Sequence, residues 1–236
     1  MGTIYWVRHG QASFGAQDYD QLSVLGEKQS RRLGEYFARR GITFEAALSG
    51  SLKRQVQTHA AIGDGWASTT PLMAALPNLA PGVPPASVWP ALNEYNSEAL
   101  IASVQTEPLE PTDSPEAYRK HFRLLRTGLT EWMAARTQPV GMPSYRDFVA
   151  GIVAAMDHVR AQHSGNVLMV SSGGPISTAV GQVLGMAAEA TIELNLRIRN
   201  SSVTEMRFSA RRCTLLTYNT LPHLDDPATI DWITYA

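Results

Sequence analysis

Short apolar runs alternate with longer amphipathic stretches along this chain, and this alternation restricts its possible folds more than any other feature. Residues 3–8 form an apolar run of strand length, and residues 23–40 follow with Leu33, Tyr36 and Phe37 at helical spacing. The same alternation continues to about residue 220. Strands that alternate with helices are typical of a mainly parallel sheet covered on both faces, so we expect a three-layer α/β/α sandwich.

The remaining elements can be placed from periodicity, caps and breakers. Ser23 is the expected N-cap of the helix that ends near Arg40, and Ser51 is the expected N-cap of the next helix. Residues 71–90, rich in proline and small residues, are expected to be irregular. We expect further strands at 43–50, 88–92, 165–171, 201–209 and 211–219, the last two as a hairpin across Ala210. We also expect a helix from 51 to Gly63 or Gly65, and helices at 115–136, 144–163 and 176–185.

Length and composition narrow the class of protein. With 236 residues the chain can bury one large core, so we expect one domain over residues 1–236 with a helical cap insertion at about 75–145. Lys and Arg number 20 and Asp and Glu 21, a balance that favours neither nucleic acid nor a membrane surface as a partner. The single cysteine, Cys213, excludes an internal disulfide. With no evident leader segment, a cytoplasmic protein is expected, and its oligomeric state cannot be predicted.

The first expected strand ends abruptly in Arg8, His9 and Gly10. Arginine offers a planar fork of donors that suits phosphate oxygens, and a neutral imidazole can attack phosphorus. Gly10 allows the backbone to approach a ligand closely. Taken alone, the same tripeptide is equally typical of a surface loop, so other residues must support an anion site.

Three more segments offer such support. Arg54 lies in the first turn of its helix, where an anion would offset its charge, although a solvated arginine is an equal alternative. Glu94 could act as a general acid if burial raises its pKa, but spacing alone does not favour it over Glu98. Gly173 and Gly174 follow a strand and could offer backbone amides to an anion. Because ligands bind at the carboxyl ends of parallel strands, we expect these segments to meet at one edge.

Five ordered segments resemble the histidine phosphatase superfamily, also called phosphoglycerate mutase-like: "VRHGQ" at 7–11, "LSVLGEKQSRRL" at 22–33, "SGSLKRQVQT" at 49–58, "LNE" at 92–94 and "VLMVSSGGPI" at 167–176. The resemblance implies catalysis through a phosphohistidine on His9, with Arg8 and Arg54 gripping the phosphate and Glu94 protonating the leaving oxygen. Gly10, Gln11 and Gly173 complete the implied phosphate-binding set. No metal and no organic cofactor is implied.

Two positions depart from the family pattern: an asparagine expected a few residues after "RHG" is missing near Gly15, which favours a phosphatase over a mutase, and the other departure bears on catalysis. Members normally have a second catalytic histidine where this chain has Ser172. A serine hydroxyl can still donate a hydrogen bond but carries no charge, which costs roughly 1–2 kcal/mol, or on the order of tenfold in rate. His59 and His121 are weak substitutes, and surface positions are expected for His158, His163 and His223.

These observations predict a phosphomonoesterase that acts on a small phosphorylated metabolite, with an activity that Ser172 could reduce. The alternatives are a catalytically weak or silent member that binds phosphorylated ligands or inorganic phosphate, because of Ser172, and a phosphoglycerate mutase. The expected cap shows no distinctive set of basic residues for a carboxylated substrate. The sequence therefore does not identify the physiological substrate.

Overall fold

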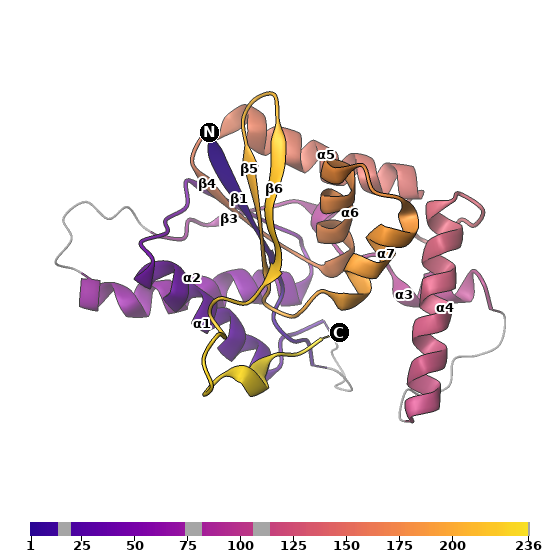
Figure 1. Cartoon of the computed structure of the whole chain (residues 1–236), viewed down its shortest axis with the longest axis horizontal. Coiled ribbons are helices and arrows are strands. Elements are labelled where there is room, and N and C mark those ends of the chain that lie inside the picture. Colours follow the sequence, from indigo (N-terminus) through magenta and orange to yellow (C-terminus); the bar gives the residue numbers. More distant parts are fainter. Residues whose placement is uncertain (14–19, 74–81, 106–113, 236) are drawn as a thin grey trace.

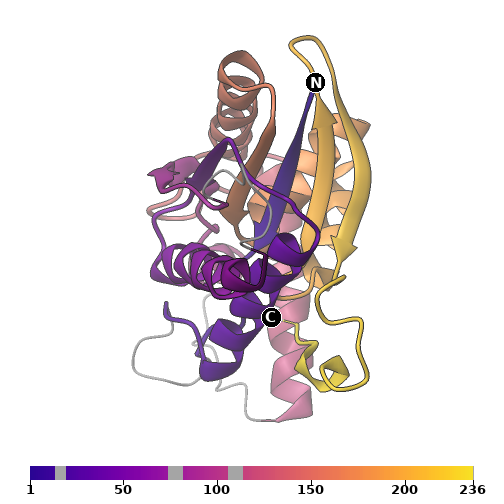
Figure 2. The same ribbon diagram turned by 90° about the vertical axis from the view of Figure 1, so that its left-hand side faces the viewer.

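The computed structural model describes residues 1–13, 20–73, 82–105 and 114–235 (Figure 1). Its centre is a six-stranded sheet in the order β3-β2-β4-β1-β5-β6. The strands are β1 (Gly2–Arg8), β2 (Ala46–Ser49), β3 (Ala86–Val88), β4 (Asn166–Ser171), β5 (Val203–Phe208) and β6 (Cys213–Thr220). The first four are mutually parallel, whereas β5 pairs antiparallel to β1 and β6 pairs antiparallel to β5. Figure 2 shows the β5–β6 hairpin and β3 at opposite edges.

Alternating side chains of the central strands supply two separate cores. From β1, Val7 packs with α1 (Val24–Arg39) and α2 (Lys53–Met73). Trp6, its neighbour, packs on the other face with α5 (Tyr145–Gln162) and α6 (Gly173–Leu184). Successive side chains of a strand point to opposite faces, so both faces of a sheet apolar throughout must be covered. The three-layer fold with a mainly parallel sheet is confirmed.

A further group of helices lies to one side of these layers (Figure 1). It contains α3 (Ser97–Ala102), α4 (Pro115–Met133) and α7 (Ala188–Arg197). Leu100, Leu129, Trp132 and Ile192 belong to a third apolar cluster that joins them. The single domain with a cap at about 75–145 stays a prediction. Among the described residues, no helix combines the length and apolarity that spanning a membrane requires.

Most expected elements are present, and the predicted N-cap of α1 is confirmed, while α5 has a similar cap that was not predicted. Ser23 accepts a hydrogen bond from the amide of Gly26, and α1 gives way to Gly41 at φ 64°. Ser144 accepts in the same way from the amide of Asp147 at the start of α5. Side-chain acceptors of this kind satisfy amides that a helix start leaves unpaired, which makes such starts readable from sequence.

The region after the second strand differs from expectation. Helix α2 does not end near Gly63 or Gly65 but runs through both glycines to Met73. Residues 71–73 are therefore helical rather than irregular. Residues 74–81 of the same expected irregular stretch lie outside the described residues. The short strand is Ala86–Val88, and residues 90–92 form a 3-10 helix instead, labelled η1 (Pro90–Leu92). Helices α3 and α7 were not anticipated.

Ser51 is not the acceptor at the start of α2. The amides of Leu52 and Lys53 bond instead to the side-chain oxygens of Gln55 and Asp20, at 3.2 and 2.9 Å. The Ser51 hydroxyl accepts from the side chain of Asn93, at 2.7 Å. Tertiary contacts therefore replace the local cap at this helix.

Candidate active site

The parallel register brings the ends of two distant strands together. Arg8 at the end of β1 lies opposite Ser171 at the end of β4, and the amide of His9 donates to the Ser171 carbonyl at 2.9 Å. The Arg8–Gly10 turn and the Ser172–Gly174 turn therefore share one sheet edge, as the sequence predicts. This edge lies outside the carboxyl ends of the parallel strands, where such sheets bind ligands.

The His9 ring is buried, and its two nitrogens have different partners. Nδ1 lies 2.7 Å from the carbonyl oxygen of Gly10. A carbonyl oxygen can only accept, so Nδ1 carries the proton in this contact. In the neutral ring the lone pair is then on Nε2, which faces the Arg54 side chain. The local backbone thus sets the tautomer that leaves Nε2 able to attack.

Arg54 reaches His9 from the first turn of α2. Its Nε donates to His9 Nε2 at 3.2 Å, and a terminal nitrogen contacts a carboxylate oxygen of Asp20 at 2.7 Å. The Arg54 side chain is nearly buried. The sequence analysis did not predict a role for Asp20, because nothing in the sequence distinguishes it from other acidic residues in loops. The contact with the Asp20 carboxylate shows that the Arg54 guanidinium can bind an anionic group at this position.

The pKa of His9 lies well below its usual range. Burial is the largest cause, and the positive charges of Arg8 and then Arg54 act in the same direction. The hydrogen bond to the Gly10 carbonyl opposes them. Both effects disfavour the imidazolium form, so His9 stays neutral under ordinary conditions.

Arg8 joins the strand end to the segment after α7. One terminal nitrogen of Arg8 donates to the carbonyl oxygen of Ile198 at 2.5 Å, and its amide donates to Ser202 at 3.0 Å. Its side chain is 5% exposed, so its charge acts in a largely desolvated setting. The loop 198–202 is thereby held against the site.

Glu94 follows η1 and faces the start of α6. The amide of Gly174 donates to both of its carboxyl oxygens, at 3.0 and 3.2 Å, and the amide of Tyr95 donates to one at 3.3 Å. Burial raises the pKa of Glu94, while the Gly174 bond and the charges of Arg54 and Arg8 oppose the rise. The carboxyl group is thus within electrostatic reach of both arginines, and the Gly174 amide is committed to it.

Ser172 is fully buried at the N-cap of α6 and has a partner that sequence reasoning missed. The side-chain amide nitrogen of Gln55 donates to Ser172 Oγ and to the Leu92 carbonyl, each at 2.9 Å. Both amide hydrogens of Gln55 are then used, and Ser172 Oγ acts as an acceptor. Among the described residues, no acceptor is found for the Ser172 proton, which can therefore serve a ligand.

A sequence signal for Gln55 exists. Gln55, Thr58, Ile62 and Trp66 recur at helical spacing and are all buried, so they form the inward face of α2. A glutamine at the start of a buried face needs polar partners, because an unpaired buried amide is costly. That requirement marks it as part of a polar site.

The other expected phosphate ligands have structural roles as well. A Cβ on Gly10 would lie 2.4 Å from the Gly26 carbonyl oxygen, so α1 requires a glycine there. The side-chain oxygen of Gln11 accepts from the Ser23 hydroxyl at 2.8 Å. Gly173 opens α6, where a Cβ would lie 2.6 Å from the side-chain oxygen of Asn195.

The remaining histidines include one surprise. His223 was expected at the surface but is 3% exposed, and its Nε2 lies 2.9 Å from the Ser201 hydroxyl. His59 Nε2 lies 3.0 Å from the Pro84 carbonyl. Over the described residues, no group of three or more His, Cys, Asp or Glu side chains is placed to hold a metal ion.

Comparisons with known proteins show the family of this chain and the fold that it shares with solved structures. The family model described as "Histidine phosphatase superfamily (branch 1)" matches residues 4–120 and 85–221. No curated protein sequence matches the chain.

Solved structures share the fold at low sequence identity. A phosphoserine phosphatase from Entamoeba histolytica is similar at TM-score 0.62 and 17% identity, over 95% of this chain and 100% of that one. A mycobacterial glucosyl-3-phosphoglycerate phosphatase reaches 0.61 and 18%, over 93% and 99%. A phosphoglycerate mutase from Bacillus anthracis reaches 0.56 and 18%, over 94% of each chain.

Proposed function

The chain belongs to the histidine phosphatase superfamily, and on that premise we propose that it hydrolyses a small phosphomonoester through a phosphohistidine on His9. The observation that best supports the proposal is the pair of contacts made by the His9 ring. Nδ1 is held by the Gly10 carbonyl, and Nε2 faces the Arg54 guanidinium. A neutral, oriented imidazole beside a cation combines a nucleophile with stabilisation of the charge that develops on phosphate.

The first step transfers the phosphoryl group to the protein. The Nε2 lone pair of His9 attacks phosphorus, the P–N bond forms, and the P–O bond to the leaving alcohol breaks. Protonated Glu94 gives its proton to the leaving oxygen, for which its raised pKa is suited. Arg54 exchanges its contact with Nε2 for a phosphate oxygen, and Arg8 binds another.

The second step releases inorganic phosphate. Glu94, now a carboxylate, takes a proton from water as the water oxygen attacks phosphorus. The P–N bond breaks, its electron pair returns to Nε2, and the starting state of His9 and Glu94 is restored. Throughout both steps, the proton stays on Nδ1, which donates to the Gly10 carbonyl oxygen, and this bond keeps the ring in one orientation.

Ser172 has a defined part in this scheme. Gln55 occupies its acceptor lone pair, so the hydroxyl proton is available to a phosphoryl oxygen. The missing positive charge of a second histidine lowers activity by on the order of tenfold.

The test compares the protein with His9→Ala on 4-nitrophenyl phosphate and a panel of alkyl phosphates. We expect turnover that is lost in His9→Ala and kept in His59→Ala, a control histidine whose hydrogen bond goes to Pro84. Brief incubation should also label His9 with phosphate in an acid-labile, base-stable bond. Equal turnover by the protein and His9→Ala, or none on any ester, contradicts the proposal.

Ser172 favours one alternative, a member of the family that binds phosphorylated ligands without consuming them. In that case phosphorylated metabolites raise the melting temperature and are recovered intact. Detection of phosphohistidine at His9 excludes this alternative.

A mutase shares the first chemical step and is the other alternative, since a phosphoglycerate mutase is among the similar structures. It must return the phosphoryl group to a sugar acid rather than to water. Interconversion of phosphoglycerates faster than their hydrolysis identifies it.

A further inference from the structure

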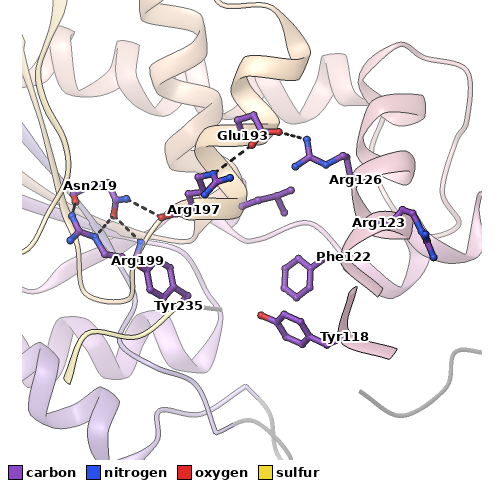
Figure 3. Close-up of a pocket in the computed structure, with 10 residues that line it drawn as sticks. Tyr118, Phe122, Arg123, Arg126, Glu193, Arg197, Arg199, Asn219 and Tyr235 are labelled. Carbon is purple, nitrogen blue, oxygen red and sulfur yellow. Dashed lines mark hydrogen bonds and ion pairs between the residues drawn. The ribbon is translucent and has the colours of Figure 1, made fainter. Parts of the chain in front are cut away.

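A cavity of about 830 Å³ lies between α4, the end of α7 and the C-terminal segment (Figure 3). Two of its lining residues, Arg197 and Arg199, flank Ile198 in sequence. The Ile198 carbonyl accepts the hydrogen bond from Arg8 in the candidate active site. The cavity therefore adjoins the loop that holds Arg8, and it is lined by none of His9, Arg54 or Glu94.

Positive charge is concentrated in this cavity. Among the residues that the structure describes, four arginines and a single glutamate line it, whereas the whole chain has a net charge of −1. The glutamate, Glu193, forms ion pairs with both Arg126 and Arg197. One carboxylate cannot offset all the guanidinium groups, so the cavity carries an excess of positive charge that attracts anions.

Arg199 is the most firmly held of these cations. Its backbone amide and Nε both bond to the Asn219 side-chain oxygen, at 2.8 and 3.4 Å, and a terminal nitrogen donates to the Asn219 carbonyl. Figure 3 shows these contacts at the wall nearest the sheet. A guanidinium fixed in this way loses little conformational entropy when it binds an anion.

Aromatic rings form the rest of the wall. The rings of Tyr118 and Phe122 lie 4.6 Å apart on α4, and Tyr235 lies across the cavity (Figure 3). Tyr118 and Tyr235 are 46% and 58% exposed, so much of their apolar surface faces water. Covering exposed aromatic surface is favourable, which suits a ligand with an apolar body.

We propose that this cavity binds the non-reacting end of the substrate, and that this end carries a second anionic group on an apolar body. The inference rests on the proposed function, because it takes the reacting phosphate to lie at His9. The second anion, a carboxylate or a second phosphate, contacts Arg126 and Arg199, and the rings cover the carbon chain between the two anions.

The test uses three esters with one six-carbon chain: hexyl phosphate, 5-carboxypentyl phosphate and hexane-1,6-diyl bisphosphate. We expect kcat/KM to be roughly tenfold higher for at least one doubly anionic ester than for hexyl phosphate. Arg126→Gln and Arg199→Gln should each remove most of this advantage through KM, measured as the ratio of kcat/KM for the doubly anionic ester to that for hexyl phosphate in the same variant. The ester that gains more tells whether the second anion is a carboxylate or a phosphate.

Arg136→Gln is the matched control. It removes the same charge from an exposed arginine that is paired with Glu131 and does not line the cavity. It should leave all three kcat/KM values unchanged. If the three esters react equally well, or if the advantage survives both cavity substitutions, the inference is wrong. Arg126 is an exposed ion-pair residue on α4, so its variant should fold even if Arg199→Gln does not.

The two proposals fail in different ways. If no ester is hydrolysed, the proposed function fails, and calorimetric dissociation constants for the same three esters then test the cavity. Tighter binding of a doubly anionic ester that is lost in Arg126→Gln supports the cavity. Equal binding of the three esters overturns it.

Discussion

At the scale of single residues, the site depends on two pKa shifts of opposite sign. Burial and the nearby arginines lower the pKa of His9, and burial raises that of Glu94. In the proposed mechanism, His9 must be neutral to attack and Glu94 must be protonated to donate before the first step. Each shift favours the required state, so one pocket can keep both groups ready over the same range of pH.

The shifts predict a bell-shaped dependence of kcat/KM on pH, with its maximum on the mildly acidic side of neutrality. Activity falls in acid as His9 takes a proton, at a lower pH than for an ordinary histidine. It falls in alkali as Glu94 loses its proton, at a higher pH than for an ordinary glutamate. In Glu94→Gln, the fall of kcat/KM in alkali should be absent. A flat profile from about pH 4 to 9 contradicts these roles.

Gln55 and Ser172 should behave as one unit. An imidazole introduced by Ser172→His would meet the Gln55 amide, which is held by the Leu92 carbonyl. We expect Ser172→His alone to gain nothing, and Ser172→His with Gln55→Ala to raise kcat by on the order of tenfold. A double-mutant cycle on aryl phosphate measures this coupling. Additive effects of the two substitutions would contradict it.

At the scale of elements, the site depends on how closely α1 and α2 approach. A Cβ on Gly34 of α1 would lie 2.0 Å from the Ile62 carbonyl oxygen, and one on Gly65 of α2 would lie 2.0 Å from the Arg31 carbonyl oxygen. Two glycines thus let the helix backbones touch. This contact positions α2, whose first turn carries Arg54.

Gly34→Ala should therefore lower the free energy of unfolding by about 2–3 kcal/mol, because neither helix backbone can yield without repacking. Gly63→Ala is the control within α2, where a Cβ would meet no atom within 4 Å. It should leave stability unchanged or raise it by about 0.5–1 kcal/mol, through helix propensity. Urea unfolding measures both, and equal effects of the two substitutions would disprove the close contact.

At the scale of the whole molecule, the chain beyond the last strand contains a buried titratable group, His223. Asn200 bonds to Thr234 and to the Tyr235 carbonyl, and His223 is buried beside Ser201. Burial, with a smaller contribution from the charge of Arg32, lowers the pKa of His223 to about 3. The folded protein therefore resists protonation at a site that the unfolded chain protonates readily.

Acid should destabilise the protein through this site. The unfolded chain binds a proton near the ordinary histidine pKa, and the folded chain only near 3, so stability falls as pH drops between these values. One such proton contributes a slope of about 1.4 kcal/mol per pH unit. His223→Asn should reduce the slope by about this amount, measured by urea unfolding between about pH 5.5 and 4. His9 titrates in the same direction, so some slope remains, and an unchanged slope in His223→Asn would contradict the assignment.

Much of the fold was predictable because its signals are local. Ser23 and Ser144 cap their helices, and the turns after β1 and β4 meet at one edge because parallel strands end together. The predicted end of α2 was wrong, because glycine is only a weak helix breaker once tertiary packing favours the helix. The burial of His223 was missed because nothing near it in sequence shows what covers it.

The sequence by itself determined the alternation of elements, the family and the position of His9 at a strand end, because periodicity, capping and strand termini depend on neighbouring residues. Only the tertiary structure decided that Gln55 holds Ser172, and that Arg126 on α4 shares a cavity with Arg199 beyond α7. Such pairs join residues far apart along the chain. Their chemistry exists only once the chain has folded, since contact between side chains depends on distance in space.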